Sequence, residues 1–515
     1  MFLNKLQPLK RRLCGVVLLC AALALPGAHA APGDLDLNYG IAGRSFAPVA
    51  GADNAFGEAA ALQADGKIVI AGRCQVLSTG TTHFCAIRLQ SNGYFDLDFN
   101  LTGNKLVFAA PGSVEIPRAV AIQPDGKIVI AGQCGADPSP TDTCVVRLLI
   151  DGSADNSFGT SGKVKFNFGT VGVQYAYAVS VLPGGKLLLG GHCRGSGVGT
   201  VGVCVMRLNA DGSLDVTFAG GGRTVASASL LGENMSDMLV RPDGRIVIAT
   251  ECNVALVGTS WDVCVSQLTA AGAWDTTFNG TGTLKLHVDA QNRKPRIALQ
   301  ADGKLIVAWL CSGGTPQSCA VRVDPDGVED TNFTFLATIP VPIPADIGEY
   351  GLKPLIQSDG RIVIASSGPA SSTISGTIDF LSIRVLGDNG LMDSTYTGGG
   401  YKTVGTTSDR ANDAVLQSDG RLVIAGSCDN GSAFTMCSVR LQRGPDVGRN
   451  CSMDIDGDGR VGATTDALLL ARASLGVNGA AILGGITFPA HATRKTWPAI
   501  RDYLALHCGM TGLSP

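Results

Sequence analysis

The sequence predicts an all-β fold, a seven-bladed β-propeller closed by its N-terminal strand, followed by a small α-helical C-terminal domain. A segment of the type ADGKIVI recurs seven times in the 515 residues, at intervals of 57 to 60 residues. The 68 glycines, the 23 prolines and the low aromatic content of 6% are typical of short strands joined by turns. Because 45% of the residues are hydrophobic and 16% are charged, the chain is neither disordered nor a coiled coil.

The first thirty residues have the pattern of an export signal peptide. Lys5–Arg12 is basic, Leu13–Leu25 is apolar, and Ala28-His29-Ala30 fits a cleavage site. No other apolar run reaches the roughly twenty residues of a membrane span, so we expect a secreted chain, extracellular or periplasmic, with no membrane span. A formal net charge of -3 argues against a nucleic-acid partner.

Each repeat contains the same succession of four predicted strands. An apolar stretch leads into a two-residue hairpin turn, for which Asp-Gly is the favoured pair. A β-branched strand, a variable loop, an alternating strand such as CVVRL and an acidic turn such as DGSLDVTF follow before a short fourth strand. The hairpin turns are Asp65-Gly66, Asp125-Gly126, Gly184-Gly185, Asp243-Gly244, Asp302-Gly303, Asp359-Gly360 and Asp419-Gly420. Since a four-stranded unit cannot bury both of its faces alone, the repeats should stack as blades around a channel.

A second motif predicts how the ring closes. An aspartate followed three residues later by an aromatic residue occurs at Asp36/Tyr39, Asp96/Phe99, Asp155/Phe158, Asp215/Phe218, Asp275/Phe278, Asp330/Phe333 and Asp393/Tyr396. This series starts before the first hairpin and ends before the last, so the final unit, Ala411–Gln442, lacks a fourth strand. We expect the strand near Gly43–Val49 to complete it beside Cys437–Leu441, which removes the open edges.

The two motifs resemble the delta-60 repeat, a bacterial repeat of roughly sixty residues, over residues 33 to 442. The resemblance implies a β-propeller in a secreted protein and brings no chemistry with it. We assign residues 31–445 to the propeller, after a signal peptide of residues 1–30.

Fourteen cysteines after the signal peptide fall into pairs, and we expect disulfides. The pairs are Cys74/Cys85, Cys134/Cys144, Cys193/Cys204, Cys252/Cys264, Cys311/Cys319, Cys428/Cys437 and Cys451/Cys508. In the first six, one cysteine ends the strand after the hairpin and the other begins the next strand. Zinc is the competing interpretation, but no C-x-x-C occurs and two thiolates do not complete a tetrahedral site. The sixth unit has Gly368 and Leu381 instead, so both cysteines are missing together.

A ligand site is expected on the face formed by the loops between second and third strands. These loops differ between repeats, whereas the hairpin and acidic turns are nearly identical. Trp261 and Phe84 are candidates for stacking on a sugar ring, with the alternative that they are packed against the protein, as isolated aromatic residues in loops usually are. No catalytic residue is predicted: the histidines His83, His192, His287, His491 and His507 have no metal-ligand spacing, and recurrent aspartates such as Asp155 and Asp215 are better explained as turn caps than as catalytic carboxylates. The recurrent arginines Arg88, Arg147, Arg207, Arg322, Arg384 and Arg440 should pair with turn carboxylates between blades.

The C-terminal segment contains one loop with the ligand pattern of a calcium site. Asp454, Asp456 and Asp458 stand at positions 1, 3 and 5, Gly459 at 6, and Arg460 offers its carbonyl at 7. Position 12 is Thr465, and the acidic residue, Asp466, comes at 13. An Asp/Gly turn that caps a helix is the alternative explanation. Helices are predicted over Ala467–Leu475 and Trp497–Leu506.

Residues 452 to 475 resemble a dockerin-type, EF-hand-like calcium repeat, so the resemblance implies Ca2+ as a cofactor in a module at residues 446–515. Dockerins carry two such loops and bind cohesin domains, but this chain has one. A calcium-stabilised cap or attachment module, tied by Cys451 and Cys508, is therefore the safer interpretation.

Together these patterns predict a secreted, non-enzymatic binding scaffold whose partner is an extracellular protein or a glycan. An extracellular carbohydrate-active enzyme and a cell-surface adhesin remain the alternatives. The sequence does not specify the ligand or the oligomeric state.

Overall fold

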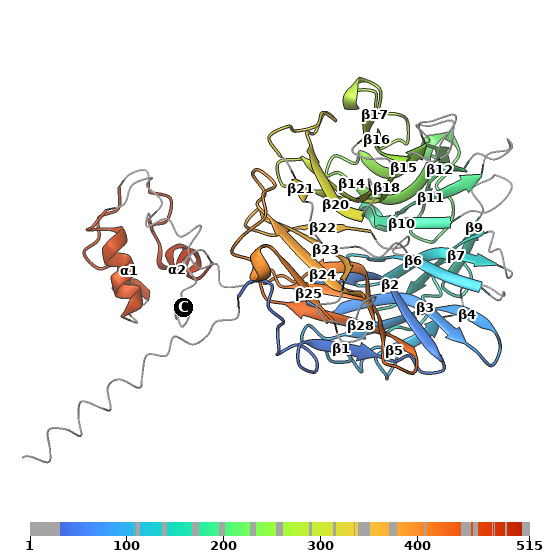
Figure 1. The fold of residues 1–515 in the computed structure, drawn as a ribbon, viewed down its shortest axis with the longest axis horizontal. Helices are drawn as coiled ribbons and strands as arrows, with labels where there is room; N and C mark the ends of the chain where they lie inside the picture. The colour runs from blue at the N-terminus through green and yellow to red at the C-terminus, as the bar shows by residue number, and fades with distance from the viewer. Residues whose placement is uncertain are drawn as a thin grey trace, which may run out of the picture. The chain divides into compact units, whose positions relative to one another are not determined.

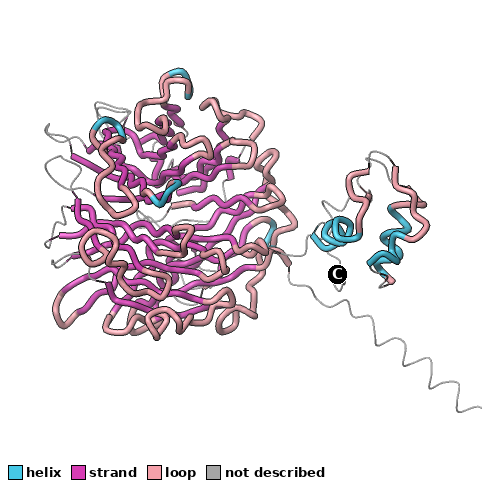
Figure 2. The backbone as a smooth tube through the Cα atoms, turned by 180° about the vertical axis from the view of Figure 1, so that it is seen from behind, coloured by secondary structure: helices cyan, strands magenta, loops and turns pink. Residues whose placement is uncertain are grey.

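The computed structural model describes residues 31–443 except 108, 110–113, 136–141, 167–174, 195–200, 227–232, 254–260, 288–290, 313–315, 334, 338–350, 370–377 and 406–407, and also 455–456 and 462–506 except 476, 478, 490 and 491. One compact unit is Gly33–Gln442, and a second contains Arg443–Pro515. Strands dominate the first unit, whereas the two α-helices belong to the second (Figure 2). None of the helices described is long and apolar enough to cross a membrane.

The strands of the first unit form antiparallel groups of four (Figure 1). Three groups are separate sheets: β10 (Tyr175–Val181), β11 (Leu187–Arg194), β12 (Val201–Leu208) and β13 (Arg223–Val225); β22 (Lys353–Ile356), β23 (Ile362–Pro369), β24 (Ile378–Val385) and β25 (Tyr401–Val404); and β26 (Asp409–Leu416), β27 (Leu422–Asp429), β28 (Phe434–Leu441) and β1 (Arg44–Ala47).

Four further groups are linked in twos. The first two groups meet at one parallel residue pair, Thr82 with Val114. One group is β2 (Asn54–Leu62), β3 (Ile68–Val76), β4 (Thr81–Leu89) and β5 (Asn104–Val107), and the other is β6 (Val114–Ile122), β7 (Ile128–Gly135), β8 (Asp142–Leu148) and β9 (Lys163–Phe166). Two further groups meet in the same way at Trp261 and Gln291. One is β14 (Glu233–Val240), β15 (Ile246–Asn253), β16 (Trp261–Leu268) and β17 (Thr283–Leu286), and the other is β18 (Gln291–Leu299), β19 (Leu305–Ser312), β20 (Pro316–Val323) and β21 (Phe335–Ala337). Short 3-10 turns are η1 (Pro183–Gly185), η2 (Phe218–Gly220), η3 (Phe278–Gly280) and η4 (Thr397–Gly399).

The first strands of the groups contact one another in succession. β2 contacts β6, and the series continues through β10, β14, β18, β22 and β26, which contacts β2 again. Apolar clusters fill the spaces between consecutive groups; one joins Val69 and Phe84 to Ile128. Another joins Ile68 to Met436, so the last group also packs on the first. Each β-branched strand face is thereby buried against a neighbouring sheet.

The N-terminal strand β1 belongs to the last group. It pairs antiparallel with β28, with Arg44 opposite Val439 and Ala47 opposite Met436, which is the partner expected for this segment. The hydroxyl groups of Tyr39 and Ser438 lie 2.8 Å apart, and Arg440 donates from Nε to Asp36 Oδ2 over 2.8 Å. The two ends of the repeat region are therefore joined by backbone and side-chain contacts.

Six disulfides link the second and third strands of their groups, as predicted. They are Cys74–Cys85, Cys134–Cys144, Cys193–Cys204, Cys252–Cys264, Cys311–Cys319 and Cys428–Cys437. In the group without a bridge, a Cβ on Gly368 would lie 3.1 Å from Leu381 Cβ, so these two residues occupy adjacent positions. Cys451 and Cys508 lie outside the described residues.

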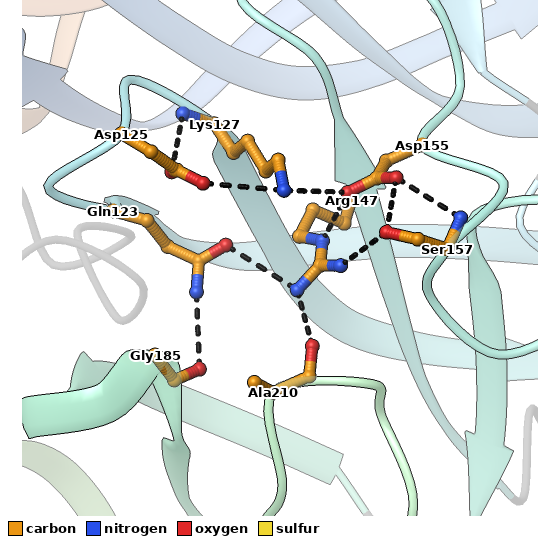
Figure 3. Close-up of polar contacts among 8 residues, drawn as sticks. All are labelled: Gln123, Asp125, Lys127, Arg147, Asp155, Ser157, Gly185 and Ala210. Carbon is orange, nitrogen blue, oxygen red and sulfur yellow. Dashed lines mark hydrogen bonds and ion pairs between the residues drawn. The ribbon is translucent and has the colours of Figure 1, made fainter.

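In five repeats, an arginine of the third strand donates a hydrogen bond to a backbone carbonyl of the following repeat. Arg147 donates from Nε to Asp155 Oδ2 over 2.7 Å and from Nη1 to the carbonyl of Ala210 in the following repeat (Figure 3). Gln123 Nε2 donates to the carbonyl of Gly185, also in the following repeat, over 3.1 Å. Equivalent donations run from Arg88 to Ile150, Arg207 to Ala270, Arg322 to Gly387 and Arg440 to Ser91. The last of these runs from the final repeat back to the first.

The prediction that these arginines pair with turn carboxylates is confirmed, but the expectation that these pairs lie between blades is wrong. Asp155 belongs to the same repeat as Arg147, because the acidic turn directly follows the third strand. Its Oδ1 accepts hydrogen bonds from the backbone N–H and hydroxyl of Ser157, over 3.0 and 2.6 Å, so the aspartate also caps its turn. The guanidinium lies 4.6 Å from the ring centroid of Phe158, the aromatic residue of the motif. Only the contact to the carbonyl crosses to the next repeat.

The fourth repeat preserves this connection with exchanged residues. Gln267 stands where the other repeats have arginine, and Arg241 stands where Gln123 lies in the second repeat. Arg241 donates from Nε to Gln267 Oε1 over 2.8 Å and from Nη1 to the carbonyl of Gly303 over 2.7 Å. Gln267 Nε2 in turn donates to Asp275 Oδ2 over 2.8 Å.

The second unit is a small helical module. Helix α1 (Asp466–Ser474), helix α2 (Trp497–Leu506) and the 3-10 helix η5 (Gly479–Leu483) surround a core of Ile455, Leu469, Ile482, Trp497, Ile500 and Leu504. The positions of both helices match the prediction to within one residue.

Replacing Arg147 with Met should lower the free energy of unfolding by about 3 kcal/mol, because Asp155 stays charged and the Ala210 carbonyl loses its donor. The matched control is Lys165→Gln, which removes one charge from an ion pair in which the lysine side chain is 51% exposed. It should cost less than about 1 kcal/mol. Urea unfolding measures both variants, and equal losses would contradict this role of Arg147.

Candidate functional site

Six of the seven first strands contain a β-bulge at the same place. The register shifts after Gly57, Pro117, Ala176, Met235, Arg293 and Ala411. A bulge leaves one extra residue without a partner in the ladder and redirects its side chain. The residues that follow the shifts are Glu58, Arg118, Tyr177, Ser236, Lys294 and Asn412.

These six residues line one cavity, which we call the axial pocket. Its volume is about 90 Å³, and Arg296 and Gly351 contribute to its wall. Gly351 precedes β22, so all seven first strands or their immediate neighbours reach the pocket. A cavity of this size accommodates several water molecules or one small polar group.

Guanidinium groups hold the carboxylates at this pocket. Glu58 lies 3.0 Å from Arg73 Nε and 3.9 Å from Arg118 Nη1. Asp413, the residue after Asn412, lies 3.6 Å from Arg296 Nη2 and 3.7 Å from Lys353 Nζ. The Glu58 and Asp413 side chains are each 11% exposed. The pocket is therefore polar, charged and largely shielded from solvent.

One wall of the pocket is aromatic. The ring centroids of Tyr177 and His192 lie 4.5 Å apart, and the Arg118 guanidinium lies 5.6 Å from the Tyr177 ring centroid. Burial lowers the pKa of His192 to about 4, and the nearby charges of Lys294 and Arg118 act in the same direction. The neutral imidazole places Nε2 3.2 Å from the carbonyl of Met235, which accepts a hydrogen bond from it.

The structure bears on several of the predicted ligand-site residues. Phe84 is fully buried in β4, in the core between two sheets, so the prediction that it stacks on a sugar is wrong. Trp261 begins β16 and lies 5.3 Å from the guanidinium of Arg293. Most of the variable loops between second and third strands lie outside the described residues. Among the residues that the structure does describe, no group of three or more His, Cys, Asp or Glu could hold a metal ion.

The predicted calcium loop is described only in part. Asp454, Asp458 and Arg460 lie outside the described residues, and Asp456 and Asp466 are both buried. Asp466 accepts hydrogen bonds from the backbone N–H of Asp456 over 2.9 Å and of Gly462 over 2.7 Å. Its carboxylate therefore joins the two ends of the loop at the start of α1.

The sequence interpretation missed the bulge residues. They lie about seven residues before each hairpin turn, inside a strand rather than in a loop. At seven residues before the turn, the repeats carry Glu58, Arg118, Tyr177, Ser236, Pro295, Leu352 and Asn412. Such diversity inside an otherwise repeated strand was the available signal, because a position that serves only the scaffold would keep one residue type.

The family comparison agrees with this architecture. A family described as a β-propeller domain of unknown function, DUF5122, matches residues 63–99, 123–158 and 182–218. The chain is thus a β-propeller repeat protein. No curated protein matches it.

Several solved structures are similar at low identity. A protein of unknown function from Dyadobacter fermentans is 12% identical, with 78% of this chain and 97% of that chain covered and a TM-score of 0.42. The polysaccharide lyase Uly1 is 13% identical, with coverages of 83% and 95% and a TM-score of 0.44. The β-propeller domain of the Trilobed protease from Pyrococcus furiosus is 11% identical, with coverages of 76% and 96% and a TM-score of 0.40. Similarity at this level is no evidence for a shared activity.

The buried neutral imidazole of His192 predicts a pH dependence of stability. Between about pH 6.5 and pH 4 the unfolded chain binds a proton at His192 that the folded chain does not, so the free energy of unfolding falls as the pH falls through this range. His192→Gln should reduce that loss, as urea unfolding at a series of pH values would measure. The control is His287→Gln, which removes an imidazole that is 63% exposed. This variant should keep the fall in the free energy of unfolding that His192 causes at low pH. An unchanged slope in His192→Gln would contradict the assignment.

Proposed function

We propose that the protein is a secreted, non-enzymatic binding protein whose ligand enters the axial pocket. The proposal includes a ring of seven blades sealed by the N-terminal strand. The unbroken succession of contacts from β2 to β26 and back, and the pairing of β1 with β28, support it. Six disulfides support an oxidising compartment outside the cytoplasm.

One observation carries the binding function. The repeats share their turns and their core residues, and six of the seven share the arginine–aspartate pair, yet six repeats send different side chains to the axial pocket and the remaining one contributes Gly351. A scaffold with sevenfold repetition that differs at one shared point is suited to recognising an asymmetric ligand there. The two carboxylates at the pocket are both held by basic side chains, which favours binding over the paired acid and base of a carbohydrate-active enzyme.

A binding screen with glycans and extracellular proteins, with the mature chain in the presence and absence of calcium, tests this function. We expect a ligand whose binding is lost in Tyr177→Ala and retained in Lys165→Gln, because Tyr177 lines the pocket and Lys165 does not. Mass spectrometry of the ligand after incubation should show no new product. Turnover that a pocket substitution abolishes would favour the enzyme instead.

We also propose that the C-terminal module binds one calcium ion through Asp454, Asp456, Asp458, the carbonyl of Arg460 and Asp466. Asp456 and Asp466 are both buried, and the backbone N–H of Asp456 donates to Asp466 Oδ1. This contact keeps the two residues close together, which supports this donor set. The ion would stabilise the loop as a cap or an attachment module, and the dockerin-like relationship belongs to this proposal.

Calcium should stabilise this module in the full mature chain. At a hundredfold excess over the dissociation constant, the gain is about 2.7 kcal/mol. Titration calorimetry should give one site per chain, lost in the double variant Asp454→Ala/Asp458→Ala and kept in Asp446→Asn, a carboxylate of the linker. If the double variant still binds one equivalent, the loop is a helix-capping turn and the calcium assignment is wrong.

A further inference from the structure

The axial pocket holds more positive than negative charge. The carboxylates around it are Glu58, Asp413 and Asp237, and the last accepts hydrogen bonds from the backbone N–H groups of Ile297 and Met238. The basic side chains at the pocket or paired with its carboxylates are Arg73, Arg118, Lys294, Arg296 and Lys353. Among the residues that line the pocket, three are basic, Arg118, Lys294 and Arg296, and one is acidic, Glu58. Glu58 and Asp413 are each shared by two basic side chains.

Two of the guanidinium groups have donors that the described part of the protein does not satisfy. Arg118 Nε and Arg296 Nε are both buried, and neither has a hydrogen-bond partner among the described residues. Lys294 forms no ion pair with any described carboxylate. Burying a donor without an acceptor is unfavourable, so this cluster favours an acceptor that comes from outside the chain.

Lys294 is held at the pocket in an unusual backbone conformation. Its φ is 53°, in the left-handed region that residues other than glycine rarely adopt. Its backbone N–H donates to Glu251 Oε1 over 2.9 Å, which fixes the bulge. Backbone strain of this kind concentrates at functional sites. Gly351 packs closely against the same residues, because a Cβ there would lie 3.0 Å from Arg296 Cγ and 3.2 Å from the carbonyl oxygen of Lys294.

We infer that the axial pocket binds a small oxyanion, the carboxylate, sulfate or phosphate group of the ligand, through Arg118, Lys294 and Arg296. This inference rests on the proposed binding function and specifies its ligand class. Guanidinium groups bind such oxyanions with paired hydrogen bonds, and an ammonium group adds a point charge. We assign the charged group of the ligand to this pocket, whose volume is about 90 Å³.

Titration calorimetry of the mature chain with sodium glucuronate, sulfate and phosphate, at constant ionic strength, tests the inference. Glucose is the neutral counterpart of glucuronate. At least one of the three anions should bind with a stoichiometry of one, and glucose should not. The three arms identify which oxyanion the pocket prefers. Arg118→Gln and Lys294→Gln should each weaken the binding at least tenfold, whereas Lys165→Gln, which removes a charge from an outer strand, should not change it.

Lys294→Gly separates binding from folding. Glycine adopts a positive φ without strain, so this variant should unfold at the same or a higher temperature than the wild type while it loses anion affinity as Lys294→Gln does. A purely structural role for Lys294 predicts the opposite, a lower unfolding temperature with unchanged affinity.

Failure of this inference is distinguishable from failure of the proposed function. If no oxyanion binds, or if the affinity survives in both charge variants, the oxyanion site is wrong. A neutral ligand from the screen that still depends on Tyr177 would then leave the binding function standing. If the screen yields no ligand and the anions do not bind, both proposals are overturned.

Discussion

The fold depends on one buried contact, the arginine that pairs with the aspartate of its own acidic turn and reaches the backbone of the next repeat. Burying a guanidinium and a carboxylate is costly unless their hydrogen bonds are satisfied. The turn provides this by donating its own backbone N–H and hydroxyl to the aspartate, while the next repeat provides a carbonyl for the arginine. Each repeat with this contact therefore depends on its successor to satisfy the buried arginine. Since Arg440 reaches Ser91, the requirement returns from the last repeat to the first.

Much of this architecture follows from local patterns that the sequence displays directly. Asp-Gly turns, paired cysteines and the count of Asp–aromatic motifs predicted the hairpins, the six bridges and the pairing of the N-terminal strand with Cys437–Leu441. These features depend on residues close in sequence or on counting how often each motif occurs in successive repeats. The two-residue form of the hairpin turns was wrong: Gln63 pairs with Lys67 across a three-residue loop in which Gly66, and not Asp65, has a positive φ. The partner of Arg147 was mistaken because a long side chain reaches both its own turn and the next repeat, and spacing alone does not distinguish them.

The candidate site was harder to predict because it arises from the backbone. A bulge is a change of register between two strands, and Glu58 or Arg118 has no local signature that distinguishes it from an ordinary strand residue. The pocket appears only when seven strands, each about sixty residues from the next, converge. Phe84 shows the converse error, since its position near a variable loop suggested exposure although it belongs to the core between two sheets.

The exchange of Gln267 and Arg241 has a consequence for how such chains diverge. With only one of the two positions altered, the repeat would bury either two guanidinium groups beside Asp275 or two amides, which would leave Asp275 with the longer ion pair to Arg245 Nη1 at 3.8 Å. Both intermediates are unfavourable, so these two substitutions are coupled, although the first position also admits an apolar residue: the third repeat has Leu182 there and keeps Arg207. Homologous sequences should then show covariation between the alignment positions of Arg241 and Gln267. Single-site mutagenesis would detect only a loss of stability at each position and would miss the compensation between them.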